Sequence, residues 1–194
     1  MEIRRISTSD SSPVDVDDVK LDLRIDGTDD EETIERMIRT AARLIEDRSG
    51  FVILQGEFEV LVDCFAPVEI MRGPFRELVS IKAMTGRNDW TDVDAADFRV
   101  IEKTRSFELS PFLPWTAPEL YTPRAGVAIR FKAGFDNTDS AQSGDDHPLD
   151  DKLQGILIAL VGHYYENREL FMADKLTEIE STAGGLLNSI RQFW

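Results

Sequence analysis

Two segments with helical periodicity, residues 13–50 and 147–171, lie near the two ends of the chain and constrain its fold most. In the first, apolar residues recur at the spacing of one helix face: Ile34, Ile38, Ala41 and Ile45. In the second, a wider apolar stripe is made by Leu153, Ile156, Leu157, Leu160, Val161 and Tyr164. The first segment predicts a short helix that begins at Pro13, a turn at residues 26–29, and a second helix that runs to about Ser49, for which Gly50 is a suitable stop. The second segment predicts one long helix, and in both segments one face is apolar and the other is acidic.

The middle of the chain, residues 51–135, changes to short alternating runs that are typical of strands. We expect strands at residues 52–62, 68–71, 78–84, 98–101, 106–109 and 125–133. The proline-rich stretch 111–123 predicts an irregular surface loop. Cys64, within LVDCFAP, is predicted at a buried or half-buried strand position.

These patterns predict an α+β fold, with a helical bundle formed by the N-terminal and C-terminal helices and a central antiparallel β-rich region. The bundle comprises residues 13–50 and 147–175, and the β-rich region residues 51–135. Residues 1–12 are predicted as a flexible arm, with an edge strand over residues 2–6 as the alternative. Residues 176–194 are predicted to be a separate C-terminal segment with a short helix at about 183–192.

The net charge of −15 counts against phosphate binding as the main activity, because DNA binding needs local neutralisation by Lys and Arg. A single cysteine excludes an internal disulfide. No apolar run reaches the roughly 18 residues of a transmembrane helix, so no membrane partner is expected. The opening MEIRRISTSDSSP lacks the apolar stretch of a signal peptide, which favours an intracellular protein.

Residues for catalysis or metal binding are few. His147 lies in a polar loop and is read as part of a turn before the next helix, with a metal site as the alternative. His163 is read as a packed or interface histidine. The acidic stretches 26–32 and 136–146 lack the EF-hand order of ligands. With no nucleophile motif or phosphate-binding loop either, we predict no catalytic residue, cofactor or metal, and no enzyme.

An ordered set of motifs resembles the head–tail connector (adaptor) family of long-tailed bacteriophages, prophages and gene transfer agents. The set comprises PVDVDDVKLDLRID, DDEETIERMIRTAARLIEDRSGFVILQGEFEVLVD, PFRELVSIKAM, GVAIRFKAGF, HPLDDKLQGILIALVGHYYENRE and a terminal IRQFW. Each motif alone is weak, but their order and spacing cover nearly the whole chain. The polar arm before Pro13 and the loop 136–147 are not family signatures.

The resemblance implies a structural role in virion assembly. Such adaptors form a ring, usually twelvefold, beneath the portal protein; they extend the DNA channel and link the capsid to the next neck or tail protein (stopper). The implied partners are the portal, the stopper, further copies of the chain, and double-stranded DNA that passes without specific binding. The implied location is the host cytoplasm during assembly and then the neck of the virion or virus-like particle.

Three residue sets follow from the resemblance. Portal docking is assigned to Leu186, Leu187, Ile190, Arg191, Phe193 and Trp194. Contacts between subunits are assigned to Arg36, Arg39, Arg43, Tyr165, Glu166 and Arg168. Because an acidic lumen repels phosphate and lets a duplex slide, we expect channel-facing residues among Asp15, Asp17, Asp18, Asp29, Asp30, Glu31 and Glu32.

Three alternatives remain open at this stage. One is another neck component, a stopper or tail terminator, although those parts rely more heavily on β structure. The second is a small acidic metal-binding hydrolase, which needs His, Asp and Glu side chains to converge on a pocket. The third is an interaction module with no connection to phage.

Overall fold

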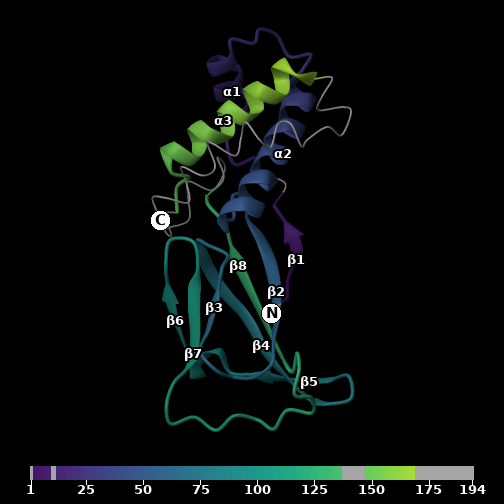
Figure 1. Cartoon of the computed structure of the whole chain (residues 1–194), viewed down its shortest axis with the longest axis vertical. Coiled ribbons are helices and arrows are strands. Elements are labelled where there is room, and N and C mark those ends of the chain that lie inside the picture. The colour runs from purple at the N-terminus through teal and green to yellow at the C-terminus, as the bar shows by residue number, and fades with distance from the viewer. Residues whose placement is uncertain (1, 10–11, 137–146, 169–194) are drawn as a thin grey trace. The chain divides into compact units, whose positions relative to one another are not determined.

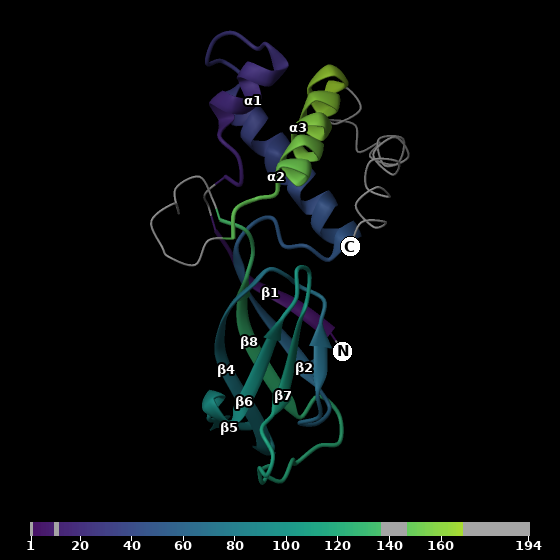
Figure 2. The same ribbon diagram turned by 90° about the vertical axis from the view of Figure 1, so that its left-hand side faces the viewer.

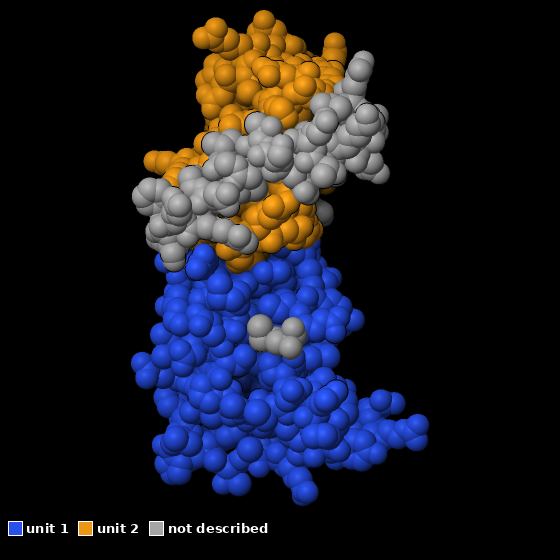
Figure 3. All heavy atoms as spheres, viewed as in Figure 1, with its two compact units in different colours: residues 1–9, 55–134 blue, residues 10–54, 135–194 orange. Residues whose placement is uncertain are grey.

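The computed structural model describes residues 2–9, 12–136 and 147–168. The chain divides into two compact units, coloured separately in Figure 3: unit 1 holds residues 1–9 and 55–134, and unit 2 holds residues 10–54 and 135–194. The predicted mixture of helices with antiparallel sheets is confirmed. The predicted emphasis on a helical bundle is too strong, because strands hold more of the described residues than helices do.

Unit 1 contains two antiparallel sheets (Figure 1). The first is ordered β1-β2-β8-β4-β5. Its strands are β1 (Glu2–Thr8), β2 (Gly56–Val62), β8 (Val127–Ala133), β4 (Phe75–Gly86) and β5 (Asp89–Val93). The second is ordered β3-β7-β6. Its strands are β3 (Val68–Ile70), β7 (Phe107–Pro111) and β6 (Phe98–Glu102).

Aromatic side chains join the two sheets of unit 1. Phe107 of β7 lies with its ring centroid 4.6 Å from that of Phe75 on β4 and 4.8 Å from that of Phe131 on β8. Phe131 also stacks on Phe58 of the neighbouring strand β2 at 5.5 Å. Alternate residues of a strand face the same side of a sheet. These phenylalanines therefore lie on the sides of the two sheets that face each other. Figure 2 shows β6 and β7 in front of the larger sheet.

Unit 2 contains three described helices: α1 (Val16–Leu23), α2 (Glu31–Ser49) and α3 (Asp151–Glu166). Their apolar stripes meet in one hydrophobic core, and all six residues of the predicted α3 stripe are buried. Gly50 ends α2 in the left-handed conformation with φ 83°. Gly162 of α3 gives α1 room, because a Cβ there would lie 2.8 Å from Leu23 Cδ2.

The structure corrects several details. Residues 2–8 form β1, so this stretch is an edge strand and not a flexible arm. Strand β5 was not predicted. Cys64 is exposed in the turn after β2, and not in a buried or half-buried strand position, because β2 ends two residues earlier at Val62. The predicted polar loop 136–147, apart from its ends, and the predicted helix at 183–192 lie outside the described residues.

Candidate functional site

Three residues from two different predicted sets meet in unit 2. Tyr165 Oη donates a hydrogen bond to Asp30 Oδ2 at 2.8 Å. Arg168 binds the same carboxylate through both terminal nitrogens, at 2.7 Å to Oδ2 and 3.3 Å to Oδ1. The Arg168 guanidinium also lies 4.1 Å from the centre of the Tyr165 ring. This Asp30 cluster (Asp30, Tyr165 and Arg168) ties the residue before α2 to the end of α3.

The electrostatics of the Asp30 cluster follow from these bonds. Hydrogen bonds from Arg168 and then from Tyr165 lower the pKa of Asp30 below its usual value. The hydrogen bond to Asp30 is the largest cause that raises the pKa of Tyr165. The carboxylate of Asp30 therefore stays ionised and accepts hydrogen bonds from the end of α3. A catalytic nucleophile or base would instead need a side open to substrate.

Two other predicted acidic residues also have structural partners within unit 2. Asp15 caps α1 by accepting a hydrogen bond from the Asp17 backbone at 2.8 Å. Glu31 accepts a hydrogen bond from Lys20 Nζ at 2.7 Å, which joins α2 to α1. Five members of the acidic set are exposed: Asp15, Asp17, Asp18, Asp29 and Glu32. Of these, Asp17 also lies 3.6 Å from Lys20 Nζ.

The remaining predicted contact residues lie on exposed surfaces or outside the described residues. Arg36, Arg39 and Arg43 are exposed on α2, and Glu166 is exposed at the end of α3. Arg43 approaches Glu46 at 3.6 Å within its own helix. The predicted portal-docking residues, Leu186 to Trp194, fall outside the described residues.

The negative charge is concentrated in unit 2. Unit 1 carries 12 basic and 13 acidic residues and unit 2 carries 10 and 24, which divides the net charge of −15 into −1 and −14. Lys and Glu side chains of unit 1 instead pair across strands, as Lys132 and Glu77 do at 2.7 Å. A surface that repels phosphate is therefore a property of unit 2.

The loop of residues 112–126 is an apolar surface feature that the sequence prediction did not single out as a site. It is tethered by Trp115, whose indole N–H donates to Asp97 Oδ2 at 2.9 Å and whose ring lies 5.1 Å from those of Phe65 and Phe98. Three large side chains of the loop are nevertheless exposed: Phe112 at 54%, Leu113 at 87% and Tyr121 at 59%. Only Glu119 and Arg124 are charged in this stretch, and the signal that the sequence offered was this low charge beside several large apolar residues.

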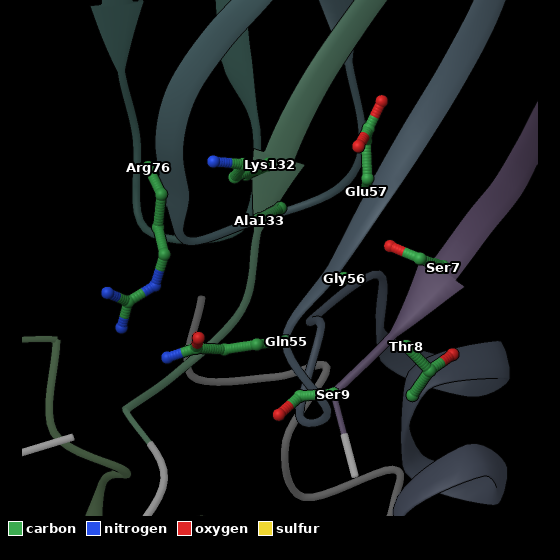
Figure 4. Close-up of a pocket in the computed structure, with 9 residues that line it drawn as sticks. All are labelled: Ser7, Thr8, Ser9, Gln55, Gly56, Glu57, Arg76, Lys132 and Ala133. Carbon is green, nitrogen blue, oxygen red and sulfur yellow. The ribbon is translucent and has the colours of Figure 1, made fainter. Parts of the chain in front are cut away.

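A pocket of about 250 Å³ in unit 1 opens beside the ends of β1, β2 and β8 (Figure 4). Its two cations have partners, because Arg76 Nε donates to Gly134 O at 2.6 Å and Lys132 pairs with Glu77. Gln55 contributes an amide nitrogen that is buried without a hydrogen-bond partner within the described part of the chain. No histidine or cysteine lines this pocket, and the mixed charges do not form a recognisable catalytic set.

Other chemical features are few in the described residues. Across residues 2–9, 12–136 and 147–168, no group of three or more His, Cys, Asp or Glu side chains is placed to hold a metal ion. His147 donates its backbone N–H to Asp136 Oδ2 at 2.7 Å, and His163 Nδ1 lies 3.4 Å from Asn167 Nδ2. None of the helices described is both long and apolar enough to span a membrane.

Comparison with known proteins finds no matching family model and no matching curated sequence. Solved structures do match. A chain in the neck of an empty GTA particle computed with C6 symmetry superimposes with a TM-score of 0.70 at 19% identity, covering 87% of this chain and 85% of that chain. A chain in the virion of a native gene transfer agent (GTA) particle gives 0.69 at 18% identity, covering 87% and 86%.

A third match, in the neck of a native GTA particle computed with C12 symmetry, gives a TM-score of 0.62 at 20% identity, with 87% and 85% covered. The chain therefore has a fold found in GTA particles. The likeness extends over most of both chains, so it includes both units and not the helices alone.

Proposed function

We propose that this protein is a structural neck component, an adaptor that links a capsid to its tail and is not an enzyme. The observation that carries the proposal is the likeness of fold, at a TM-score of 0.70 over 87% of the chain, to a chain in the neck of a GTA particle. The protein's role is then to supply geometry and contact surfaces. The Asp30 cluster supports that role, because its polar groups are engaged in joining helices.

The proposed assembly is a ring of identical copies, twelvefold as in the family that the sequence resembles. Two of the similar structures were computed with C6 and C12 symmetry, which are cyclic symmetries. A cyclic ring of more than two copies needs two different surfaces on each copy, which meet head to tail. Unit 2 offers different exposed surfaces on α1 and α2.

Two surfaces are assigned to other proteins. The segment from Leu186 to Trp194 docks on the portal protein, since large aromatic side chains such as Trp194 suit a partner's groove. The loop of residues 112–126 receives the downstream neck or tail protein, because it exposes Phe112, Leu113 and Tyr121 on a tethered backbone. Aromatic side chains of this kind are enriched at protein interfaces.

Double-stranded DNA passes through the ring without being held. Asp29 and Glu32 are the acidic residues assigned to the channel, because both are exposed next to the start of α2. Asp15, Asp30 and Glu31 are less suited, since each is engaged by another group of unit 2. The net charge of −14 on unit 2 supports this assignment, because negative charge repels the phosphates of the duplex.

The deciding experiment is electron microscopy of portal-bearing capsids mixed with the purified protein. We expect a ring of added density directly beneath the portal, lost when residues 187–194 are deleted. Density that joins only to capsids already carrying an adaptor identifies a stopper, and density at the end of a tail tube identifies a tail terminator. No attachment to any of these particles refutes a role in the neck.

A further inference from the structure

The loop of residues 112–126 joins β7 to β8 (Figure 1) and is held at both of its ends. At its start, Asp97 accepts two hydrogen bonds from the loop. The Asp97 backbone oxygen receives the Phe112 N–H at 2.8 Å, and its carboxylate Oδ2 receives the Trp115 indole N–H at 2.9 Å. One residue outside the loop therefore fixes its first turn.

The far end of the loop is held in a similar way. Tyr121 donates its backbone N–H to Met84 O, and Ala125 donates its own to Asp63 Oδ1, both at 2.8 Å. Ala125 has a φ of 51°, in the left-handed region that residues with a side chain rarely adopt. The bond to Asp63 stabilises this strained conformation. Strained backbone held by its surroundings is concentrated at functional sites, which makes the loop a candidate for one.

The exposed apolar side chains of the loop lie at these held positions. Phe112 and Tyr121 each donate their own backbone N–H to a fixed acceptor, and Leu113 lies between Phe112 and Trp115. A loop that runs from residue 112 to 126 without helix or strand is longer than most connections within a compact unit. Such loops are usually functional or disordered, and the bonds at both ends favour function.

We propose that Asp97 and Asp63 are positioning residues, which hold the apolar loop in its binding shape before the downstream neck or tail protein arrives. Because little of the loop then has to be ordered on binding, less binding free energy is lost to conformational entropy. The inference rests on the proposed function, which assigns the loop to that protein. It adds the two residues that prepare the loop for its partner.

The composition of the loop indicates the kind of surface that it meets. Its exposed large side chains are uncharged, and only Glu119 and Arg124 carry charge between residues 112 and 126. The partner should therefore offer an apolar groove with few charges at its centre. Outside the loop, the large apolar side chains that the described residues expose lie on four separate segments: Ile6, Leu21, Met71 and Val79. A second copy of the chain is therefore a poorer match than another protein with such a groove.

Removal of one bond at a time tests the positioning role. Asp97→Ala removes the acceptor of the Trp115 N–H, and Trp115→Phe removes the donor while keeping an aromatic ring. Hydrogen exchange of the Phe112 amide should become about tenfold faster in both variants, because the loop opens more often. Asp63→Ala should have the same effect on the Tyr121 amide. Asp97→Asn should exchange as the wild type does, since its amide oxygen still accepts the indole N–H.

Binding is measured with capsids that carry each variant, mixed with the purified neck protein that follows the adaptor in the same particle. Asp97→Ala, Trp115→Phe and Asp63→Ala should each bind that protein about tenfold more weakly than the wild type, and Asp97→Asn should bind with wild-type affinity. Glu119→Ala is the matched control, because it removes an exposed carboxylate from the same loop and should change neither exchange nor binding. Circular dichroism checks that all variants keep the wild-type fold.

Three results overturn the proposal. The first is loop amides that exchange at wild-type rates in Asp97→Ala and Asp63→Ala, and the second is a loosened loop that still binds the neck protein with wild-type affinity. The third is self-association of the wild type that Leu113→Ala abolishes, which would make a second copy the occupant. The proposed function fails separately. If Asp97→Ala loosens the loop but the wild type on capsids binds no downstream protein, the assignment of the loop to that protein is refuted, while its positioning by Asp97 stands.

Discussion

Asp30 and Tyr165, which are 135 residues apart in the sequence, are joined by a hydrogen bond of 2.8 Å between the carboxylate and the phenol. Asp30 occupies the N-cap position of α2, yet its side chain makes no capping hydrogen bond to that helix. The carboxylate instead receives Tyr165 and Arg168. The Asp30 side chain thus does not cap its own helix, and it holds the end of α3 instead.

Replacement of Asp30 should show this connection in the stability of the protein. We expect Asp30→Asn to lower the midpoint of urea unfolding, because an amide cannot accept two charge-assisted bonds from Arg168 while accepting one from Tyr165. Asp29→Asn is the matched control, since Asp29 is exposed beside it and should leave the midpoint near that of the wild type. Equal midpoints for the two variants would contradict the role of the cluster.

Acid should destabilise unit 1 through Glu59. Hydrogen bonds, first from Arg130 and also from Arg4, lower the pKa of Glu59 in the folded protein. The stabilisation is therefore complete above the unfolded pKa of about 4.3 and is lost as the pH falls through the folded pKa. Urea unfolding between about pH 5 and 3 should show a smaller slope with pH for Glu59→Gln than for the wild type. Arg130→Gln removes the main cause and should also reduce the slope; an unchanged slope in both variants would be evidence against the linkage.

Two phenylalanines provide a matched test of core packing. Phe131 is fully buried between Phe58 and Phe107, so Phe131→Ala should destabilise unit 1 by about 3–5 kcal/mol through lost contacts and a cavity. Phe112→Ala removes the same atoms from an exposed side chain and should change the free energy of unfolding by less than about 0.5 kcal/mol. Chemical denaturation followed by fluorescence measures both, and similar losses would refute the assignment of Phe131 to the core.

The apolar loop should matter for assembly and not for folding. A variant with Phe112→Ala, Leu113→Ala and Tyr121→Ala should unfold close to the wild-type midpoint, since Trp115 and its bond to Asp97 are kept. In the capsid experiment it should still join the portal but fail to recruit the downstream neck or tail protein. Normal recruitment would remove this loop from the proposed interface, and loss of portal attachment would show that the surfaces were assigned the wrong way round.

Elements with a strong local pattern could be predicted from the sequence. Helix α2 was predictable because its buried residues repeat at helical spacing, and β8 because buried Ile129 and Phe131 alternate with Arg130 and Lys132. Strand β5 was missed because Asp89–Val93 is a polar edge strand that pairs only with β4, so it needs no apolar alternation. The position of Cys64 was wrong because no local signal marks the end of β2 at Val62.

The candidate site was predictable only in its parts. Tyr165, Arg168 and Asp30 were each selected, but as members of two separate surfaces, because sequence spacing does not report contacts between residues 135 or 138 apart. Leu21 is an apolar residue of the same predicted helix as Val19. Only the structure shows that Val19 is buried while Leu21 faces solvent. The division of charge between units likewise needed the boundaries at Ser9, Leu54 and Gly134.

Strands β2 and β8 are paired from Gly56 with Ala133 to Val62 with Val127, so the chain leaves unit 2 and returns to it through neighbouring strands. During synthesis from the N-terminus, the ribosome completes residues 55–134 before it begins α3. At about 5–20 residues per second this takes roughly 4–16 s. Unit 1 can close its sheets in that time, while α1 and α2 wait for the α3 side chains that complete their core. The length of the β insertion therefore sets how long nascent helices expose an apolar face on which chaperones or aggregation can act.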